Sequence, residues 1–139
     1  MAELTLTDAL VQSSFLVQGT MRRVAARHDL SVVQMRLLGI LRDREPGILV
    51  LAGYLELDKS SVTGLVDRAE KRGLVERVRD PDDGRAVRIK LTRAGRSVVA
   101  KGSAEVDEEI DAATAALSEA ERKRLASLLS DVVADRVRS

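Results

Sequence analysis

The first part of the chain carries apolar residues at helical spacing. These residues are Leu6, Leu10, Val17, Met21 and Val24. Thr5, followed by Asp8 three residues later, supplies a signal for an amino-terminal helix cap. Because residues three or four positions apart share one face of a helix, the pattern predicts a long first helix that ends near His28.

Two shorter helices are expected next. Ser31 and Gln34 form a capping box that opens a second helix, which runs to about Asp43 and stops before Pro46. The apolar run of residues 48–55 has the length of a buried strand or of a short buried helix, and periodicity does not separate the two. Its position directly before another helical segment favours a helix.

The segment from Lys59 to Arg72 has a single apolar stripe. Asp58 is a suitable cap at its start, and Gly73 is a suitable stop at its end. The stripe consists of Val62, Leu65, Val66 and Ala69. We therefore predict two helices joined by a short turn.

After Gly73 the period changes from helical to alternating. Residues 74–79 and 87–91 alternate apolar and charged side chains, and the sequence Asp-Pro-Asp-Asp-Gly at 80–84 favours a turn between them. The pattern predicts a charged β-hairpin. Helix, turn, helix and basic hairpin, in this order, are typical of a winged helix-turn-helix.

The carboxyl-terminal part returns to helical spacing. Thr92 caps a long helix to about Ala116, and a second capping box, Ser118 with Glu121, opens the last helix. A two-helix arm in so short a chain cannot bury the apolar stripes of the first and last helices, so we expect a homodimer. The alternative is a monomeric bundle in which these helices pack only on the centre of one chain.

The elements together predict a mostly α fold with a small β-hairpin wing. Residues 31–96 are expected to form the winged helix-turn-helix DNA-binding domain, and residues 1–30 and 97–139 a helical dimerisation lobe. With 139 residues, 45% of them apolar and 32% charged, the chain fits one soluble domain with an appendage. It has no apolar run near the ~20 residues of a membrane span and no targeting signal, so we expect a cytoplasmic protein without a membrane partner.

The cysteine and histidine counts exclude several kinds of chemistry. With 0 Cys and 1 His, the chain lacks the parts for a disulfide framework, a thiolate zinc site, a cysteine nucleophile and most hydrolase relays. We expect no catalytic residues, no metal and no cofactor. The acidic run of residues 105–111 suits a hard cation less well than a solvated face paired with Arg from another helix. Residues 53–60 resemble a phosphate-binding loop, but Asp58 stands where that loop needs glycine.

Charge is segregated along the chain. The net charge is +1, yet residues 59–96 contain 11 Lys and Arg against 6 Asp and Glu, a local charge of +5 that leaves −4 elsewhere. A cationic segment in a nearly neutral protein suggests an anionic partner, of which nucleic acid is the commonest in cytoplasm. The winged helix-turn-helix pattern of the same segment favours double-stranded DNA. A solvated surface is the alternative interpretation.

The second helix of the predicted helix-turn-helix has an outward polar face. Small hydroxyls allow close approach to bases or phosphates, and cations can neutralise phosphate or donate to guanine. The chain has no Asn, and none of its Gln lies on this helix, so bidentate reading of adenine is excluded there. Alternatively, the serines merely satisfy the helix start. The candidates are Lys59, Ser60, Ser61, Thr63 and Arg68.

The hairpin is expected to contact DNA through arginine. Arg85 follows the turn and is slim enough to enter the minor groove, and Arg77, Arg79 and Arg88 lie on the flanking strands. Asp83 is expected to hold Arg85 or a neighbouring arginine through a charge-assisted hydrogen bond. The alternative is a solvated hairpin with internal salt bridges.

The residues of this segment resemble the MarR family of bacterial transcription regulators. The resemblance lies in Leu51-Ala52, Leu57 to Thr63, Leu65 to Arg68, Glu70 to Val75, and Asp83-Gly84-Arg85 through Leu91-Thr92 to Gly95. It implies a triangular homodimer whose two winged domains read a palindromic operator, usually as a repressor. Carried over from the family, the DNA contacts fall on Ser60, Ser61, Thr63, Arg68 and Arg85, with Asp83 orienting the last.

The resemblance also implies a small aromatic or anionic effector that binds between the lobes and releases DNA. Aromatic residues make up only 1% of the chain, so a ring-lined pocket is not evident. Phe15, Arg22 and Met35 are the candidates for an effector cleft, and core packing is the alternative for Phe15 and Met35. Glu56 stands at a turn position where the family usually has glycine. A nucleoid-type protein without sequence preference, or a winged module for protein contact, is the competing function.

Overall fold

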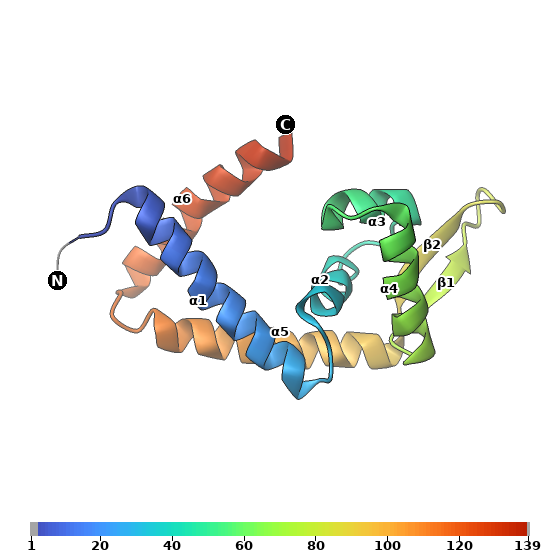
Figure 1. The fold of residues 1–139 in the computed structure, drawn as a ribbon, viewed down its shortest axis with the longest axis horizontal. Helices are drawn as coiled ribbons and strands as arrows, with labels where there is room; N and C mark the ends of the chain where they lie inside the picture. The colour runs from blue at the N-terminus through green and yellow to red at the C-terminus, as the bar shows by residue number, and fades with distance from the viewer. Residues whose placement is uncertain (1–2, 139) are drawn as a thin grey trace. The chain divides into compact units, whose positions relative to one another are not determined.

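The computed structural model describes residues 3–138, and side chains as far as Ala134. Six helices and one two-stranded antiparallel sheet are present in this range (Figure 1). In order they are α1 (Leu6–Arg27), α2 (Val32–Ile40), α3 (Ile48–Leu55), α4 (Lys59–Lys71), β1 (Val75–Arg79), β2 (Val87–Leu91), α5 (Arg93–Ala113) and α6 (Glu119–Arg138). The predicted mostly α fold with a hairpin wing is confirmed. The apolar run 48–55 is a helix, as its context indicated.

The chain divides into two compact units. The winged unit ends at Val106 and contains α1 to β2 with most of α5, and the second unit, from Asp107 onward, contains the end of α5 and α6. Among residues 3–138, no helix is both long enough and apolar enough to cross a lipid bilayer.

The predicted caps are present at the helix starts. Thr5 Oγ1 accepts a hydrogen bond from the Asp8 N–H at 3.1 Å. The Ser31–Gln34 and Ser118–Glu121 capping boxes are both complete, with bonds of 2.8 to 3.1 Å. These side chains satisfy amide groups that have no partner within the helix, which explains why each helix begins where the sequence predicts.

Two helix ends were predicted wrongly. α2 ends at Ile40 rather than Asp43, because the Arg42 N–H bonds to the Gly39 carbonyl at 3.3 Å and tightens the last turn. α5 ends at Ala113 rather than Ala116, and the Leu117 N–H bonds back to the Thr114 carbonyl at 3.0 Å. A tight final turn and one more turn of α-helix are compatible with the same spacing of apolar residues. The apolar pattern therefore does not show where the helix ends.

The core of the winged unit joins α2, α3, α4 and the hairpin. Fully buried side chains come from each of these elements, and Met35 packs against the cluster. They include Leu37, Leu38, Leu51, Val62, Val66, Val75 and Ile89. This core fixes α4 against the sheet and leaves its other side free.

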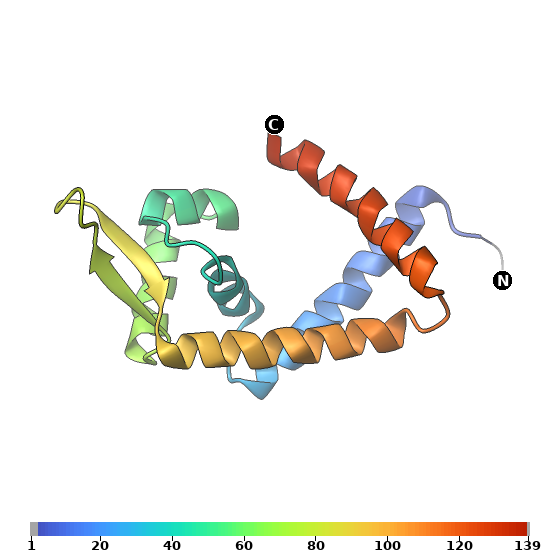
Figure 2. The ribbon, with the colours of Figure 1, turned by 180° about the vertical axis from the view of Figure 1, so that it is seen from behind.

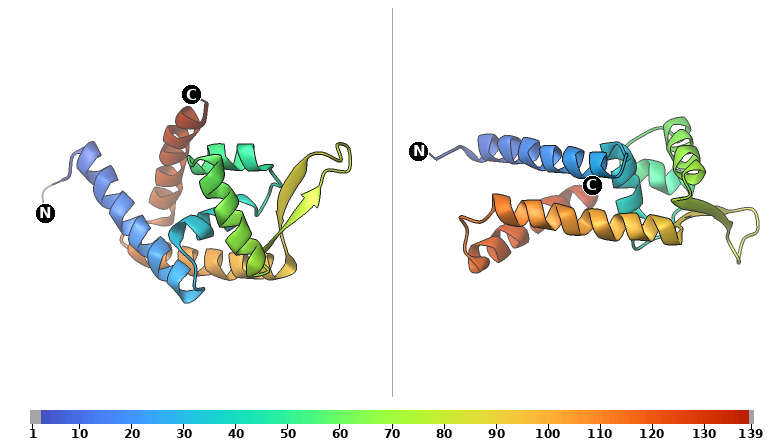
Figure 3. Two further views of the ribbon diagram at one scale, coloured as in Figure 1. Left: turned by 45° about the vertical axis from the view of Figure 1, so that its right-hand side comes forward. Right: turned by 90° about the horizontal axis from the view of Figure 1, so that it is seen from below.

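The hairpin register places its side chains on two faces. Val75 pairs with Leu91 and Arg77 with Ile89, so these four residues lie on the face that meets the core. Glu76 pairs with Lys90 and Val78 with Arg88 on the opposite face. The turn between the strands extends away from α3 and α4 (Figure 3).

Gly95 is required where α5 begins against the sheet. A side chain there would collide with the Leu74 carbonyl. Thr92 Oγ1 holds the same junction, because it donates to the Gly73 carbonyl at 2.6 Å and accepts from the Gly95 N–H at 3.0 Å. The hairpin therefore runs into α5 through a fixed corner.

Candidate nucleic-acid interface

Asp58 fixes the start of α4. Its Oδ1 accepts the Ser61 N–H at 2.7 Å, and its Oδ2 accepts the Ser61 hydroxyl at 3.0 Å. These bonds, the one from the Ser61 N–H above all, lower the pKa of Asp58. Ser61 thus completes the helix cap, which is the role that the alternative interpretation gave to the serines. Its hydroxyl oxygen can still accept a hydrogen bond.

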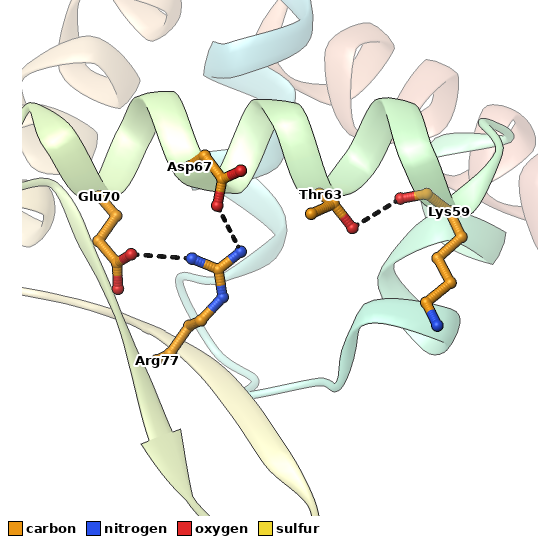
Figure 4. Close-up of polar contacts among 5 residues, drawn as sticks. All are labelled: Lys59, Thr63, Asp67, Glu70 and Arg77. Atoms are coloured by element: carbon orange, nitrogen blue, oxygen red, sulfur yellow. Dashed lines mark hydrogen bonds and ion pairs between the residues drawn. The ribbon is translucent and has the colours of Figure 1, made fainter.

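The outward face of α4 carries hydroxyls and cations. Val62, Leu65, Val66 and Ala69 are buried, as predicted, and the side chains of Lys59, Ser60 and Arg68 are exposed. The Thr63 hydroxyl donates to the Lys59 carbonyl at 2.8 Å, which fixes the Thr63 rotamer near the helix start (Figure 4). Gly64 lies under the Arg68 guanidinium, since a Cβ there would be 3.3 Å from Arg68 Nη1.

Arg77 is held by carboxylates of α4. Its Nη2 donates to Asp67 Oδ1 at 2.7 Å and its Nη1 to Glu70 Oε1 at 2.8 Å (Figure 4). Its side chain is 28% exposed. The sequence predicts Arg77 as a DNA contact, and in the structure Arg77 ties β1 to α4 and neutralises two acidic groups on that helix.

The hairpin turn is built on carboxylate and carbonyl acceptors. Asp80 Oδ1 accepts the Asp82 N–H at 2.9 Å, and Asp83 Oδ1 accepts the Arg85 N–H at 3.1 Å. Arg79 Nη1 donates to the Gly84 carbonyl at 3.3 Å. Asp83 therefore holds the main chain of Arg85, where the sequence predicted a bond to a guanidinium, and the Arg85 side chain is exposed.

Arg88 lies on the other face of the hairpin. The register pairs it with Val78, whereas Arg77 and Arg79 belong to the face toward α4. Arg88 Nε is 3.9 Å from Asp80 Oδ2, beyond hydrogen-bond distance. Of the predicted wing residues, Arg79 thus shares with Arg77 the side of the hairpin that α4 occupies, while Arg85 lies in the turn between the strands.

Arg72 is a connecting residue that the sequence did not reveal. Its guanidinium donates to the Asp29 carbonyl at 2.6 Å and to the His28 carbonyl at 3.0 Å, which joins the end of α4 to the end of α1. His28 Nε2 is in turn 2.8 Å from Glu105 Oε1, and Arg27 contacts the same carboxylate at 2.9 Å. The bonds from Arg27 and then His28 lower the pKa of Glu105. Glu105, the first residue of the acidic run, is thus paired with Arg from another helix, as the sequence suggested for the run.

The three candidates for an effector cleft differ in exposure. The Phe15 side chain is 69% exposed, so the alternative of core packing within one chain is wrong for it. Arg22 is also exposed, while Met35 is partly buried against the core. Phe15 and Arg22 both belong to α1, and Met35 belongs to α2.

Comparison with known proteins identifies relatives along almost the whole chain. A model of the MarR family matches residues 28–86. The homoprotocatechuate degradative operon repressor of Escherichia coli is 28% identical over 132 residues, covering 94% of this chain and 88% of that protein. The transcriptional regulator FarR of Neisseria gonorrhoeae is 30% identical over 126 residues, covering 88% and 85%.

A solved structure extends the comparison to the fold. NadR in complex with 4-hydroxyphenylacetate matches with a TM-score of 0.75 at 26% identity, over 95% of this chain and 94% of that one. The relatives are transcriptional regulators and not enzymes. Helix order, hairpin and relatives agree, and the chain belongs to the MarR family of transcription regulators.

Proposed function

We propose that the chain is a sequence-specific repressor that binds a palindromic operator as a homodimer in the cytoplasm. α4 enters the major groove with Lys59, Ser60, Ser61 and Thr63 at its start, and Arg68 reaches the phosphates. Arg79 and Arg85 follow the adjacent minor groove, while Arg77 braces the hairpin. The observation that carries this proposal is the polar, cationic outer face of α4, on a helix whose other side is buried.

Exposed apolar side chains support the homodimer. On α1 they include Leu6, Leu10, Val11, Phe15, Leu16 and Val17, and on α6 they are Leu125, Leu128, Leu129, Val132 and Val133. Apolar stripes of this length on a single chain are typical of surfaces that a partner covers. A two-fold pair carries two α4 helices, which explains why a palindromic operator suits it.

Selection of bound fragments from the source genome tests the proposal and identifies the operator. At physiological salt we expect the operator to bind ~10³-fold or more tighter than random duplex. Log affinity should fall with log salt at about −0.9 per phosphate neutralised. Equal affinity for operator and random duplex would indicate a nucleoid-type protein, and the absence of salt-dependent DNA binding would indicate a module for protein contact.

We further propose that a small aromatic acid releases the operator. One relative is named as the repressor of a homoprotocatechuate degradative operon, and the solved NadR structure contains 4-hydroxyphenylacetate. Arg22 supplies a cation for a carboxylate, and Phe15 and Met35 supply apolar contacts. Titration of 4-hydroxyphenylacetate into the protein–operator complex should release DNA, and Arg22→Gln should weaken that response. If neither this acid nor its ring analogues change operator affinity, the effector proposal is wrong and the DNA-binding proposal stands.

A further inference from the structure

A hollow of about 420 Å³ lies on the winged unit between the α2–α3 loop, β2 and the first turn of α5. Five of its lining residues are cationic and two are acidic, which gives a local charge of +3. The cations are Arg42, Arg44, Arg88, Lys90 and Arg96. The proposed DNA-binding function uses none of them.

The hairpin register sets this hollow apart from the DNA-binding face. Arg88 and Lys90 project from the sheet face opposite the one on which Arg77 meets α4. Viewed from behind, β2 lies nearer the viewer than α4 (Figure 2). The hollow therefore lies on the side of the hairpin away from the α4 surface that is proposed to bind the duplex.

The walls of the hollow are held in place by hydrogen bonds. The Ile89 N–H donates to the Pro46 carbonyl at 2.9 Å, which keeps the α2–α3 loop against β2. Arg96 Nη1 donates to the Leu91 carbonyl at 3.1 Å, and the Arg44 guanidinium stacks 4.8 Å from the centre of the Tyr54 ring. Two of the cations are thus oriented by neighbouring groups before any ligand arrives.

Arg88 is the cation with the clearest unmet need. Its Nε is buried and makes no hydrogen bond within the described residues, while the side chain as a whole is 34% exposed and Asp80 Oδ2 lies 3.9 Å from Nε. A buried charged donor without an acceptor is unfavourable, and nearby like charges add repulsion. An anion that offers several oxygen acceptors would relieve both effects.

We propose that the hollow binds a small phosphorylated molecule through its phosphate or pyrophosphate group. Arginine forks match phosphate oxygens, and the charge of +3 on the lining residues favours an anion, although Glu76 Oε1 lies 3.5 Å from Lys90 Nζ outside the lining. The hollow exceeds the size of one phosphate, so it has room for an organic moiety that carries that group. We expect this site to bind its ligand in the protein without DNA, and the proposal goes beyond the proposed function.

Calorimetric titration with inorganic pyrophosphate tests the site in the intact, DNA-free protein. About 0.15 M salt screens exposed charges and suppresses diffuse binding. We expect one pyrophosphate per chain, a loss of roughly tenfold or more in affinity for Arg88→Gln, and a smaller loss for Lys90→Gln. Arg93→Gln is the matched control, because Arg93 is exposed on the same turn of α5 as Arg96 and does not line the hollow.

A second arm with duplex DNA identifies the source of the phosphate. If the natural ligand is a free small molecule, we expect Lys90→Gln to weaken pyrophosphate binding. Its effect on DNA affinity should then be no larger than the effect of Arg93→Gln. The proposal is overturned if the parent does not bind pyrophosphate, or if Arg93→Gln loses as much affinity as Lys90→Gln. It is also overturned if Lys90→Gln weakens DNA binding alone, because the phosphate then belongs to the duplex. Lys90 is partly exposed, so its variant keeps the test valid if Arg88→Gln fails to fold.

Discussion

Arg85 is the single side chain on which the proposed wing contact depends most. Its main chain is fixed by Asp83 at 3.1 Å, and its guanidinium is exposed beyond the turn. We expect Arg85→Ala to weaken operator binding about tenfold, to lower the salt slope by ~0.9 and to reduce the preference for A·T-rich flanks. Fluorescence anisotropy with labelled duplex measures all three. Arg124→Ala, an exposed cation on α6, is the control, and unchanged affinity of the Arg85 variant at fixed salt would refute the wing contact.

The sequence did not give the bonding partners of the hairpin residues. Asp83 and Arg85 were identified as a pair, but the carboxylate holds a main-chain N–H rather than a guanidinium. The partners of Arg77 lie seven and ten residues away on α4, and the strand register selects them. An alternating pattern shows that Arg77 lies on a strand, but it does not show which carboxylates the strand meets.

At the scale of elements, Arg77 connects the hairpin to α4. Arg77→Met leaves Asp67 and Glu70 unneutralised on the helix that is proposed to approach phosphates, so we expect operator affinity to fall about tenfold. The loss of folding stability should be small, at most ~1 kcal/mol, because both pairs are partly exposed. Anisotropy and urea unfolding separate the two effects.

Adding Asp67→Asn and Glu70→Gln to Arg77→Met provides the rescue control. The triple variant should recover most of the operator affinity, because it no longer carries uncompensated negative charge on α4. If it binds as weakly as Arg77→Met, then Arg77 contacts DNA directly, as the sequence predicted.

The cap of α4 makes stability depend on acid pH. Asp58 has a lowered pKa in the folded protein, so its contribution is complete above the ordinary carboxyl pKa and is lost as pH falls through the folded value. Asp58→Asn retains an acceptor for the Ser61 N–H but does not titrate. We expect the difference in urea midpoint between pH 7 and about pH 3 to be smaller in this variant than in the parent. Asp107→Asn, an exposed carboxylate on α5, serves for comparison, and equal pH dependence of parent and Asp58→Asn would contradict the prediction.

Glu56 places a non-glycine residue in left-handed backbone after α3. Its φ of 54° explains why the family usually has glycine at this position. The resemblance to the family indicated that glycine is usual there, but it did not give the backbone geometry. Glu56→Gly should raise the free energy of unfolding by ~0.5–1 kcal/mol, because relief of strain exceeds the added freedom of the unfolded chain. Thermal and urea unfolding measure the change. A decrease in stability would show that contacts of the Glu56 side chain outweigh the strain.

At the scale of the whole molecule, charge and apolar surface are divided between different parts of the chain. The cationic residues concentrate in 59–96, and the exposed apolar stripes lie on α1 and α6. Both divisions are visible in the sequence, because they depend only on which residue types occur in which segment. The hollow lined by Arg42, Arg88 and Arg96 was not visible there, because it unites a loop, a strand and a helix that are far apart along the chain.

This division predicts that association and DNA contact can be separated by mutation on α6. Leu128 is 53% exposed in one chain and Val132 is 60% exposed, one turn further along the same stripe. Leu128→Glu combined with Val132→Glu places two charges in the interface, so we expect sedimentation to show a monomer at concentrations where the parent is a dimer. Operator affinity should then fall by at least ~10², because each half-site is bound separately. Ser127→Glu adds charge on the opposite side of α6 and should leave a dimer with parental DNA affinity; dissociation of that variant, or a dimeric double variant, would place the interface elsewhere.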